Sequence, residues 1–106
     1  MPKYLFEVKY TLQGVQGLLA EGGTSRLVAA TAAADSLGGT VEAFYYAFGE
    51  HDVYSIVDMP DAESMAAYAM RITAAGGVTT RTVPLLTAGQ VDTAAAKQVG
   101  YRPPGS

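Results

Sequence analysis

The only histidine of the chain, His51, lies between two carboxylates, Glu50 and Asp52. An imidazole beside a carboxylate can act as a general base or proton shuttle, because it exchanges protons near neutral pH. His51 is therefore the candidate catalytic residue. Turns favour polar residues for reasons of geometry, so an exposed turn, or a bond across a dimer, explains the same residues.

We predict no metal site at this turn. One histidine with carboxylates that point to opposite sides of a strand does not make a tetrahedral ligand set. The chain also contains no cysteine, which excludes a disulfide, a thiolate nucleophile and a cysteine-based zinc site. We likewise expect no cofactor, because Gly22–Ser25 lacks the glycine pattern and the lysine of a nucleotide-binding loop.

A second set of candidates lies on the first predicted strand, where Glu7 and Lys9 share one face. Buried charges must be paired or hydrogen-bonded. Glu7 and Lys9 could pair with each other or with Arg81 on the fourth predicted strand, and could then face a polar ligand. A structural ion pair, or exposure near a strand end, is the alternative.

Tyrosines around the turn supply apolar surface with a polar tip. They could line a cavity, or they could pack in the core or at an interface. The candidate ligand-binding residues are Glu7, Lys9, Tyr45, His51, Asp52, Tyr54 and Arg81. The remaining tyrosines to which the same alternatives apply are Tyr4, Tyr10, Tyr46 and Tyr68.

Four segments have the pattern of strands: residues 4–11, 40–48, 53–58 and 78–86. In the first, Tyr4, Phe6, Val8 and Tyr10 alternate with Leu5, Glu7, Lys9 and Thr11. The second and third are joined by a short turn, so they should be antiparallel neighbours. Pro84 lacks a backbone donor, so the fourth should be an edge strand or hold its proline at the strand end.

Helices are predicted between these strands. The glycine-rich segment 12–23 favours a short helical turn and a loop, with a helix starting from Thr24 or Ser25 as N-cap and stopping at Gly38–Gly39. Asp61 should cap a helix over 62–75. Thr87 and Gln90 form a capping box that opens a helix reaching about Val99.

This order predicts an α+β, ferredoxin-like βαββαβ fold with a four-stranded antiparallel sheet plus a C-terminal helix. Both crossover helices should cover one face. The second and third strands are nevertheless apolar on both faces, with Val41, Ala43 and Tyr45 opposed to Phe44, Tyr46 and Phe48. A dimeric α+β barrel, in which two sheets pack face to face, would bury the bare face. We assign residues 1–99 to this domain and 100–106 to an extended tail.

The Gly-Glu-His-Asp turn, the Pro-Asp helix start and the Gly-Val strand with its threonines resemble the GYD domain family, across about residues 3–90. That resemblance implies a dimeric α+β barrel, but no established reaction. Residues 49–86 are also similar to ligand-sensing domains of leucine-responsive/AsnC-type regulators. His51 stands where the family has its tyrosine, so a role of that phenol is not implied here.

Composition narrows the function. A net charge of −3 and seven scattered basic residues argue against binding nucleic acid. No apolar run spans a bilayer and no signal peptide is visible, so we expect a cytoplasmic location and no membrane partner. We predict a small homo-oligomeric binding or regulatory protein, a homodimer or larger assembly formed through the sheet face, with a small-molecule pocket there. The alternatives are a cofactor-free enzyme of the barrel monooxygenase or isomerase type, and a structural protein whose tail docks on a neighbouring subunit.

Overall fold

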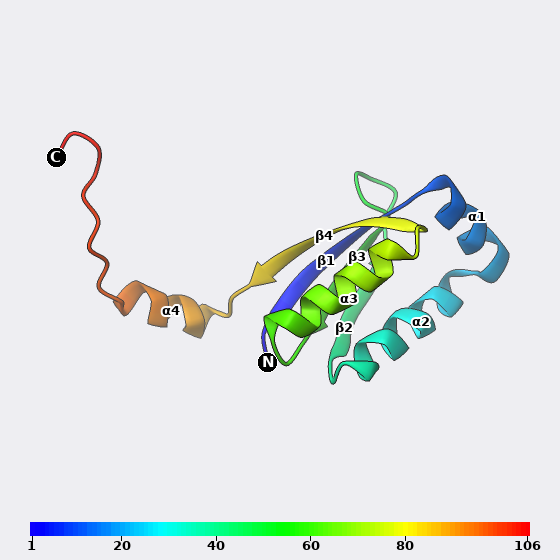
Figure 1. Cartoon of the computed structure of the whole chain (residues 1–106), viewed down its shortest axis with the longest axis horizontal. Coiled ribbons are helices and arrows are strands. Elements are labelled where there is room, and N and C mark those ends of the chain that lie inside the picture. Colours follow the sequence, from blue (N-terminus) through cyan, green and yellow to red (C-terminus); the bar gives the residue numbers. More distant parts are fainter.

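The computed structural model describes residues 1–106 and places four antiparallel strands in one sheet (Figure 1). The strands lie in the order β2–β3–β1–β4. Their bounds are Lys3–Tyr10 (β1), Thr40–Tyr46 (β2), Val53–Asp58 (β3) and Val78–Leu85 (β4). β1 and β3 are central, and the predicted α+β, ferredoxin-like fold is confirmed.

The alternation of β1 decides which residues form the core. Its even-numbered residues are buried or half-buried beneath the helices, and its odd-numbered residues lie on the other face. The register sets Glu7 opposite Tyr54 of β3 and Arg81 of β4. One strand therefore supplies both the core and the polar candidates. The buried core consists of Tyr4, Phe6, Val8, Ala34, Val53, Val57, Met59, Met65 and Tyr68.

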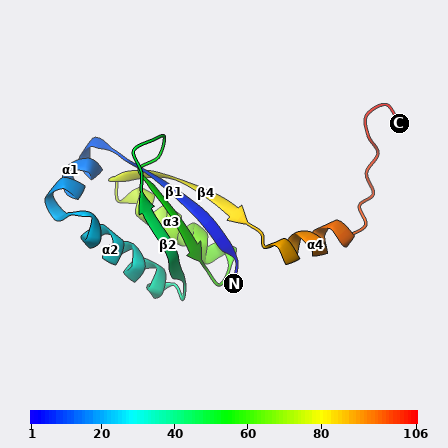
Figure 2. The same cartoon turned by 180° about the vertical axis from the view of Figure 1, so that it is seen from behind.

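Two helices, α2 (Gly23–Ser36) and α3 (Ala62–Ala74), cover the core face, and the opposite face carries none (Figure 2). α3 begins at its predicted cap, where Asp61 Oδ1 accepts the N–H of Ser64 at 2.7 Å. The hydrogen bonds from Ser64 hold the pKa of the Asp61 carboxyl below its usual value. We call the helix-covered side the covered face and the other side the open face.

The glycine-rich segment after β1 is helical, and our prediction of a turn and loop is wrong. α1 spans Leu12–Glu21, and Thr11 caps it by accepting the N–H of Gly14 at 3.1 Å. Thr11 N also donates to Gly77 O at 3.0 Å, and a side chain on Gly14 would collide with that same carbonyl. Contacts with a distant loop therefore stabilise a helix that its glycines alone disfavour.

α2 also begins earlier than predicted. Its N-cap is Gly22, with φ of 86°, and neither Thr24 nor Ser25 has that role. A positive φ is accessible to glycine at little cost, so the chain turns directly from α1 into α2 at this residue. The predicted stop is confirmed, because α2 ends before Gly38, which has φ of 76°.

The predicted division of the β2 side chains between the two faces is wrong at Val41, because the strand contains a bulge. The register shifts between Val41, which pairs with Val57, and Ala43, which pairs with Ile56. The extra residue moves Val41 to the covered face and leaves Ala43 on the open face. β2 also ends at Tyr46, so Phe48 lies in the loop and is fully exposed.

The last helix, α4 (Ala88–Ala96), leaves the body of the molecule. It starts at the predicted capping box, in which Thr87 N donates to Gln90 Oε1 at 2.8 Å, but it ends short of Val99. Figure 1 shows α4 and residues 97–106 extending beyond the end of β4, which gives the molecule a longest dimension of 58 Å. We call residues 86–106 the arm. Pro84 lies in β4, which is an edge strand as predicted.

Candidate functional site

Four of the predicted site residues meet on the open face, and we call Glu7, His51, Tyr54 and Arg81 the Glu7 cluster. The Oε2 atom of Glu7 lies 3.8 Å from His51 Nε2 and 3.7 Å from Arg81 Nε. The other imidazole nitrogen, Nδ1, lies 3.5 Å from the hydroxyl of Tyr54, with the two rings edge to face. The cluster joins a carboxylate, an imidazole, a phenol and a guanidinium.

The loop 47–52 is fixed to β1, and this places His51 over Glu7. The N–H of Asp52 donates to Val8 O at 2.8 Å, and the N–H of Tyr10 donates to Asp52 Oδ2 at 2.8 Å. A further bond from Ala47 N to Asp52 O at 2.9 Å closes the loop. Asp52 therefore positions the loop, and its carboxylate accepts a hydrogen bond from the backbone of β1.

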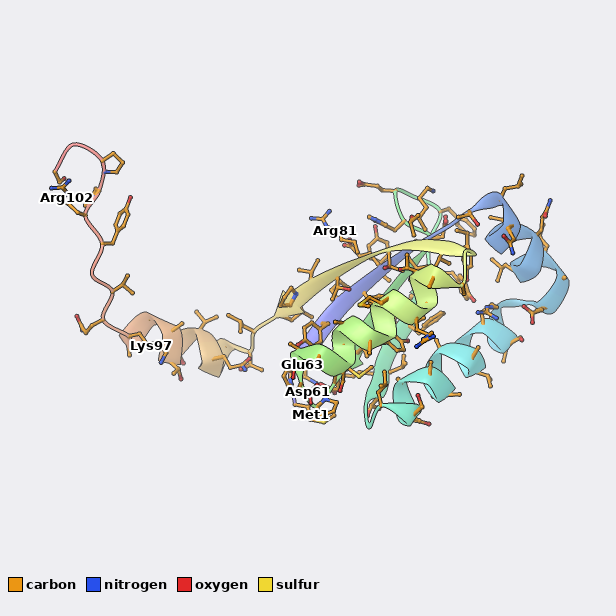
Figure 3. The ribbon with its side chains drawn as sticks, viewed as in Figure 1. Met1, Asp61, Glu63, Arg81, Lys97 and Arg102 are labelled. Carbon is orange, nitrogen blue, oxygen red and sulfur yellow. The ribbon has the colours of Figure 1, made fainter.

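The centre of the cluster is shielded from solvent and incompletely bonded. The side chains of Glu7 and His51 are only 13% and 17% exposed, whereas that of Arg81 is 69% exposed. Figure 3 shows Arg81 projecting from β4 away from α3. The Oε2 atom of Glu7 is buried and accepts no hydrogen bond. A buried carboxylate oxygen without a donor is costly, and a movement of the exposed Arg81 side chain beside it would let another molecule donate a hydrogen bond to it.

The remaining candidates lie at the margin of the cluster. Lys9 Nζ is 3.8 Å from Asp52 Oδ2, so of the two pairings considered for Glu7 the structure has the one with Arg81. Tyr45 stands opposite Tyr54 in the register and its side chain is largely in solvent, since the residue is 72% exposed.

Other tyrosines belong to the covered face. Burial raises the pKa of Tyr68 to about 12. Burial, followed by the neighbouring Tyr46 hydroxyl, raises the pKa of Tyr10 to about 12. Tyr68 donates to Ala30 O at 3.3 Å and Tyr46 to Gly23 O at 3.0 Å. Tyr68 therefore packs in the core, and Tyr10 and Tyr68 also line a hollow on this face.

The open face around the cluster carries both apolar and charged side chains. No helix covers it, and the side chains there come from all four strands. The apolar and aromatic members of this face are Leu5, Ala43, Tyr45, Tyr54, Ile56, Val83 and Leu85, and its other polar members include Lys3, Lys9, Thr40, Asp58 and Thr79. Apolar side chains such as Leu5, Ile56 and Val83 thus lie beside the Glu7 cluster.

A hollow on the covered face was not predicted. It lies between α2 and α3, has a volume of about 290 Å³, and has Arg26 and Arg71 among its lining residues. The signal in the sequence is the spacing of Ala29, Ala30 and Ala33 on α2, which removes volume from the helix face that contacts the sheet. Helical spacing of alanines also fits close packing, so the pattern alone does not distinguish a hollow from a tight contact.

Together, the βαββαβ order, the single antiparallel sheet and the polar cluster on its open face define a small ferredoxin-like α+β domain. The model of the GYD domain family matches residues 4–95, and the chain belongs to that family. Comparison with curated proteins and with solved structures gives no match. The similarity to AsnC-type ligand-sensing domains stays a prediction.

Two further features bear on partners and ions. None of the helices combines the length and the apolar character needed to cross a membrane. No three histidine, aspartate or glutamate side chains converge as metal ligands would.

Proposed function

We propose that the protein binds a small molecule between the open faces of two copies, with the Glu7 cluster as the polar part of the site. The observation that carries this proposal is the buried Oε2 atom of Glu7, which has no hydrogen-bond donor and lies on the sheet face that no helix covers. In a ligand-bound dimer, the apolar side chains of this face would be buried and the Oε2 atom would gain a hydrogen-bond donor.

The apolar surface supports the dimer. Tyr45 stands on this face with most of its side chain in solvent, beside the partly exposed Leu5, Ile56 and Val83, and a second copy would bury these apolar side chains. Two sheets that pack face to face lie about 10 Å apart with their side chains interdigitated, so a ligand between them would replace some of those side-chain contacts. The second copy encloses the site, because a single open sheet cannot surround a ligand.

The ligand chemistry follows from the cluster. Glu7 Oε2 needs a donor, such as a hydroxyl, amide or amine, and Arg81 Nε can donate to an acceptor on the same molecule. Leu5, Ile56 and the ring of Tyr54 offer apolar contacts beside this polar centre. We therefore propose a small ligand with both a donor and an apolar body.

Native mass spectrometry of the freshly purified protein tests both the dimer and the bound ligand. We expect a dimer that carries excess mass, and we expect Glu7→Gln to retain the dimer but lose the added mass. Val83→Lys, on the open face, should give monomers, whereas Val28→Lys, on the exposed surface of α2, should not. A wild-type monomer at micromolar concentration, or a bound ligand unaffected by Glu7→Gln, would contradict the proposal.

A second candidate is a cofactor-free enzyme. The Tyr54 hydroxyl, the two nitrogens of His51 and Glu7 lie in succession, with separations of 3.5 Å and 3.8 Å, and would form a path for a proton once the imidazole moves within hydrogen-bond distance of Glu7. Once native mass spectrometry has identified the ligand, measuring its turnover by the wild type and by His51→Gln distinguishes an enzyme from a binding protein. Equal turnover by the two proteins would remove His51 from any mechanism.

A third candidate assigns the arm to assembly. All residues of α4 and of 97–106 are exposed, and Figure 3 shows Lys97 and Arg102 far from the body of the molecule. We propose that the arm docks on a neighbouring subunit, which would cover Val91 and Tyr101. Deletion of residues 100–106 should then lower the assembly state in sedimentation experiments, and an unchanged state would count against docking of the tail.

A further inference from the structure

The hollow between α2 and α3 lies on the covered face, so the sheet separates it from the Glu7 cluster. Its volume of about 290 Å³ is near the lower limit for small-molecule sites. A neighbouring hollow of about 430 Å³ shares Ala33, Tyr68, Arg71 and Ile72 with it, so the two hollows adjoin, and we call them together the groove. The floor consists of Phe6, Val8, Phe44 and Ser55.

Small side chains on α2 leave this space. Ala29, Ala30 and Ala33 line the groove where larger side chains would fill it. The hydroxyl of Tyr68 donates to Ala30 O at 3.3 Å and links α3 to α2 across the groove. Because the walls are largely apolar, a ligand here would bind mainly by burying its own apolar surface.

Arg71 gives the groove its charge. Every other lysine and arginine of the folded body has a carboxylate within 4 Å, and these pairs are Lys3 with Glu42 and Asp58, Lys9 with Asp52, Arg26 with Glu21, and Arg81 with Glu7. Arg71 has none, and it lines both hollows. Arg26 also lines the inner one but is paired with Glu21, so Arg71 is the guanidinium available to an anion beside this apolar groove.

We propose that this groove binds a small amphipathic carboxylate, with its apolar chain between the helices and its carboxylate at Arg71. The site is distinct from the one between the open faces, so it requires neither a dimer nor the Glu7 cluster. A planar guanidinium offers two parallel donors to a carboxylate, which favours an acid over an alcohol of the same length.

Isothermal titration calorimetry with decanoate and with decanol, both below the concentration at which they aggregate, tests the site. We expect decanoate to bind with a negative heat-capacity change, and decanol to bind more weakly. Arg71→Gln should weaken decanoate binding about tenfold and leave decanol unchanged. Lys97→Gln, which removes an equally unpaired cation from the arm, is the matched control and should change neither.

A second variant separates this groove from the open face. Ala33→Leu places a larger side chain in the part shared by both hollows, so it should abolish binding of both probes without lowering the melting temperature. Glu7→Gln should leave both unchanged. Absence of decanoate binding to the wild type, an equal response of acid and alcohol to Arg71→Gln, or full binding by a folded Ala33→Leu protein would overturn the proposal.

Discussion

The two faces of the sheet differ in how completely their polar groups are satisfied. On the covered face the buried Ser55 hydroxyl donates to Phe6 O at 3.1 Å. On the open face, one residue further along β1, the Oε2 atom of Glu7 is buried without a donor. Phe6 and Glu7, adjacent in β1, thus lie on a face whose buried hydroxyl is hydrogen-bonded and on a face whose buried carboxylate oxygen is not. On the open face a partner or ligand can add hydrogen bonds that the chain itself does not make.

The largest expected effect comes from truncating one apolar side chain on each face of β1 and comparing the losses in the free energy of unfolding. Phe6→Ala should lower the free energy of unfolding by about 3 to 5 kcal/mol, because Phe6 is only 2% exposed and its removal leaves a cavity. Leu5→Ala, its neighbour on the open face, should cost less in a monomer, because Leu5 is only partly buried. Urea denaturation at several protein concentrations measures both.

The same pair sharpens the dimer proposal. If open faces pack together, the cost of Leu5→Ala should grow with protein concentration, because a dimer interface contributes by mass action. A cost of Leu5→Ala that is independent of concentration would mean that the open face stays unpaired.

An alkaline titration tests the covered face next. The pKa of Tyr68 rises from 10.0 to about 12 on burial, so above pH 10 the unfolded state loses its proton first. The free energy of unfolding is therefore not reduced by this residue below pH 10, and it should fall by about 2 to 3 kcal/mol as the pH rises to 12. Urea denaturation along this range, with Tyr68→Phe as control, measures the loss. A wild-type curve parallel to that of the control would refute it.

The smallest effect compares the two buried polar groups directly. Ser55→Ala should destabilise the protein by about 1 kcal/mol, because Phe6 O then loses its donor. Glu7→Gln should be neutral or stabilising by up to about 1 kcal/mol in the ligand-free protein, because it removes a charge that the fold satisfies poorly. Thermal denaturation of the ligand-free proteins gives both values. Equal losses for the two variants would mean that Glu7 is satisfied in solution.

The strands and their faces were largely predictable, because a period of two and short turns are local signals. Asp61 and the Thr87 capping box were found for the same reason. α1 was missed, since its stability depends on the contact between Gly14 and Gly77, which are distant in sequence. The β2 bulge at Val41 was missed because an extra residue in a strand leaves no mark on composition.

The candidate site was predictable in membership and only partly in geometry. Glu7, His51 and Arg81 were named from residue type and strand parity, and register places them together. That Asp52 bonds the backbone of β1 could not be predicted, because the path of a loop depends on tertiary contacts. The unpaired state of Arg71 required knowing where all ten carboxylates of the chain lie.

The antiparallel pairing of β1 with β4, and the arm that follows β4, has a mechanical consequence. Lys3 lies opposite Leu85, so the arm leaves the sheet at the end where β1 begins. A force that pulls the arm away from β1 loads the hydrogen bonds of this ladder one pair after another, as in the opening of a zipper. An unfoldase that grips the arm would therefore strip β4 first and expose the edge of β1, at a lower force than shearing the whole ladder at once would need.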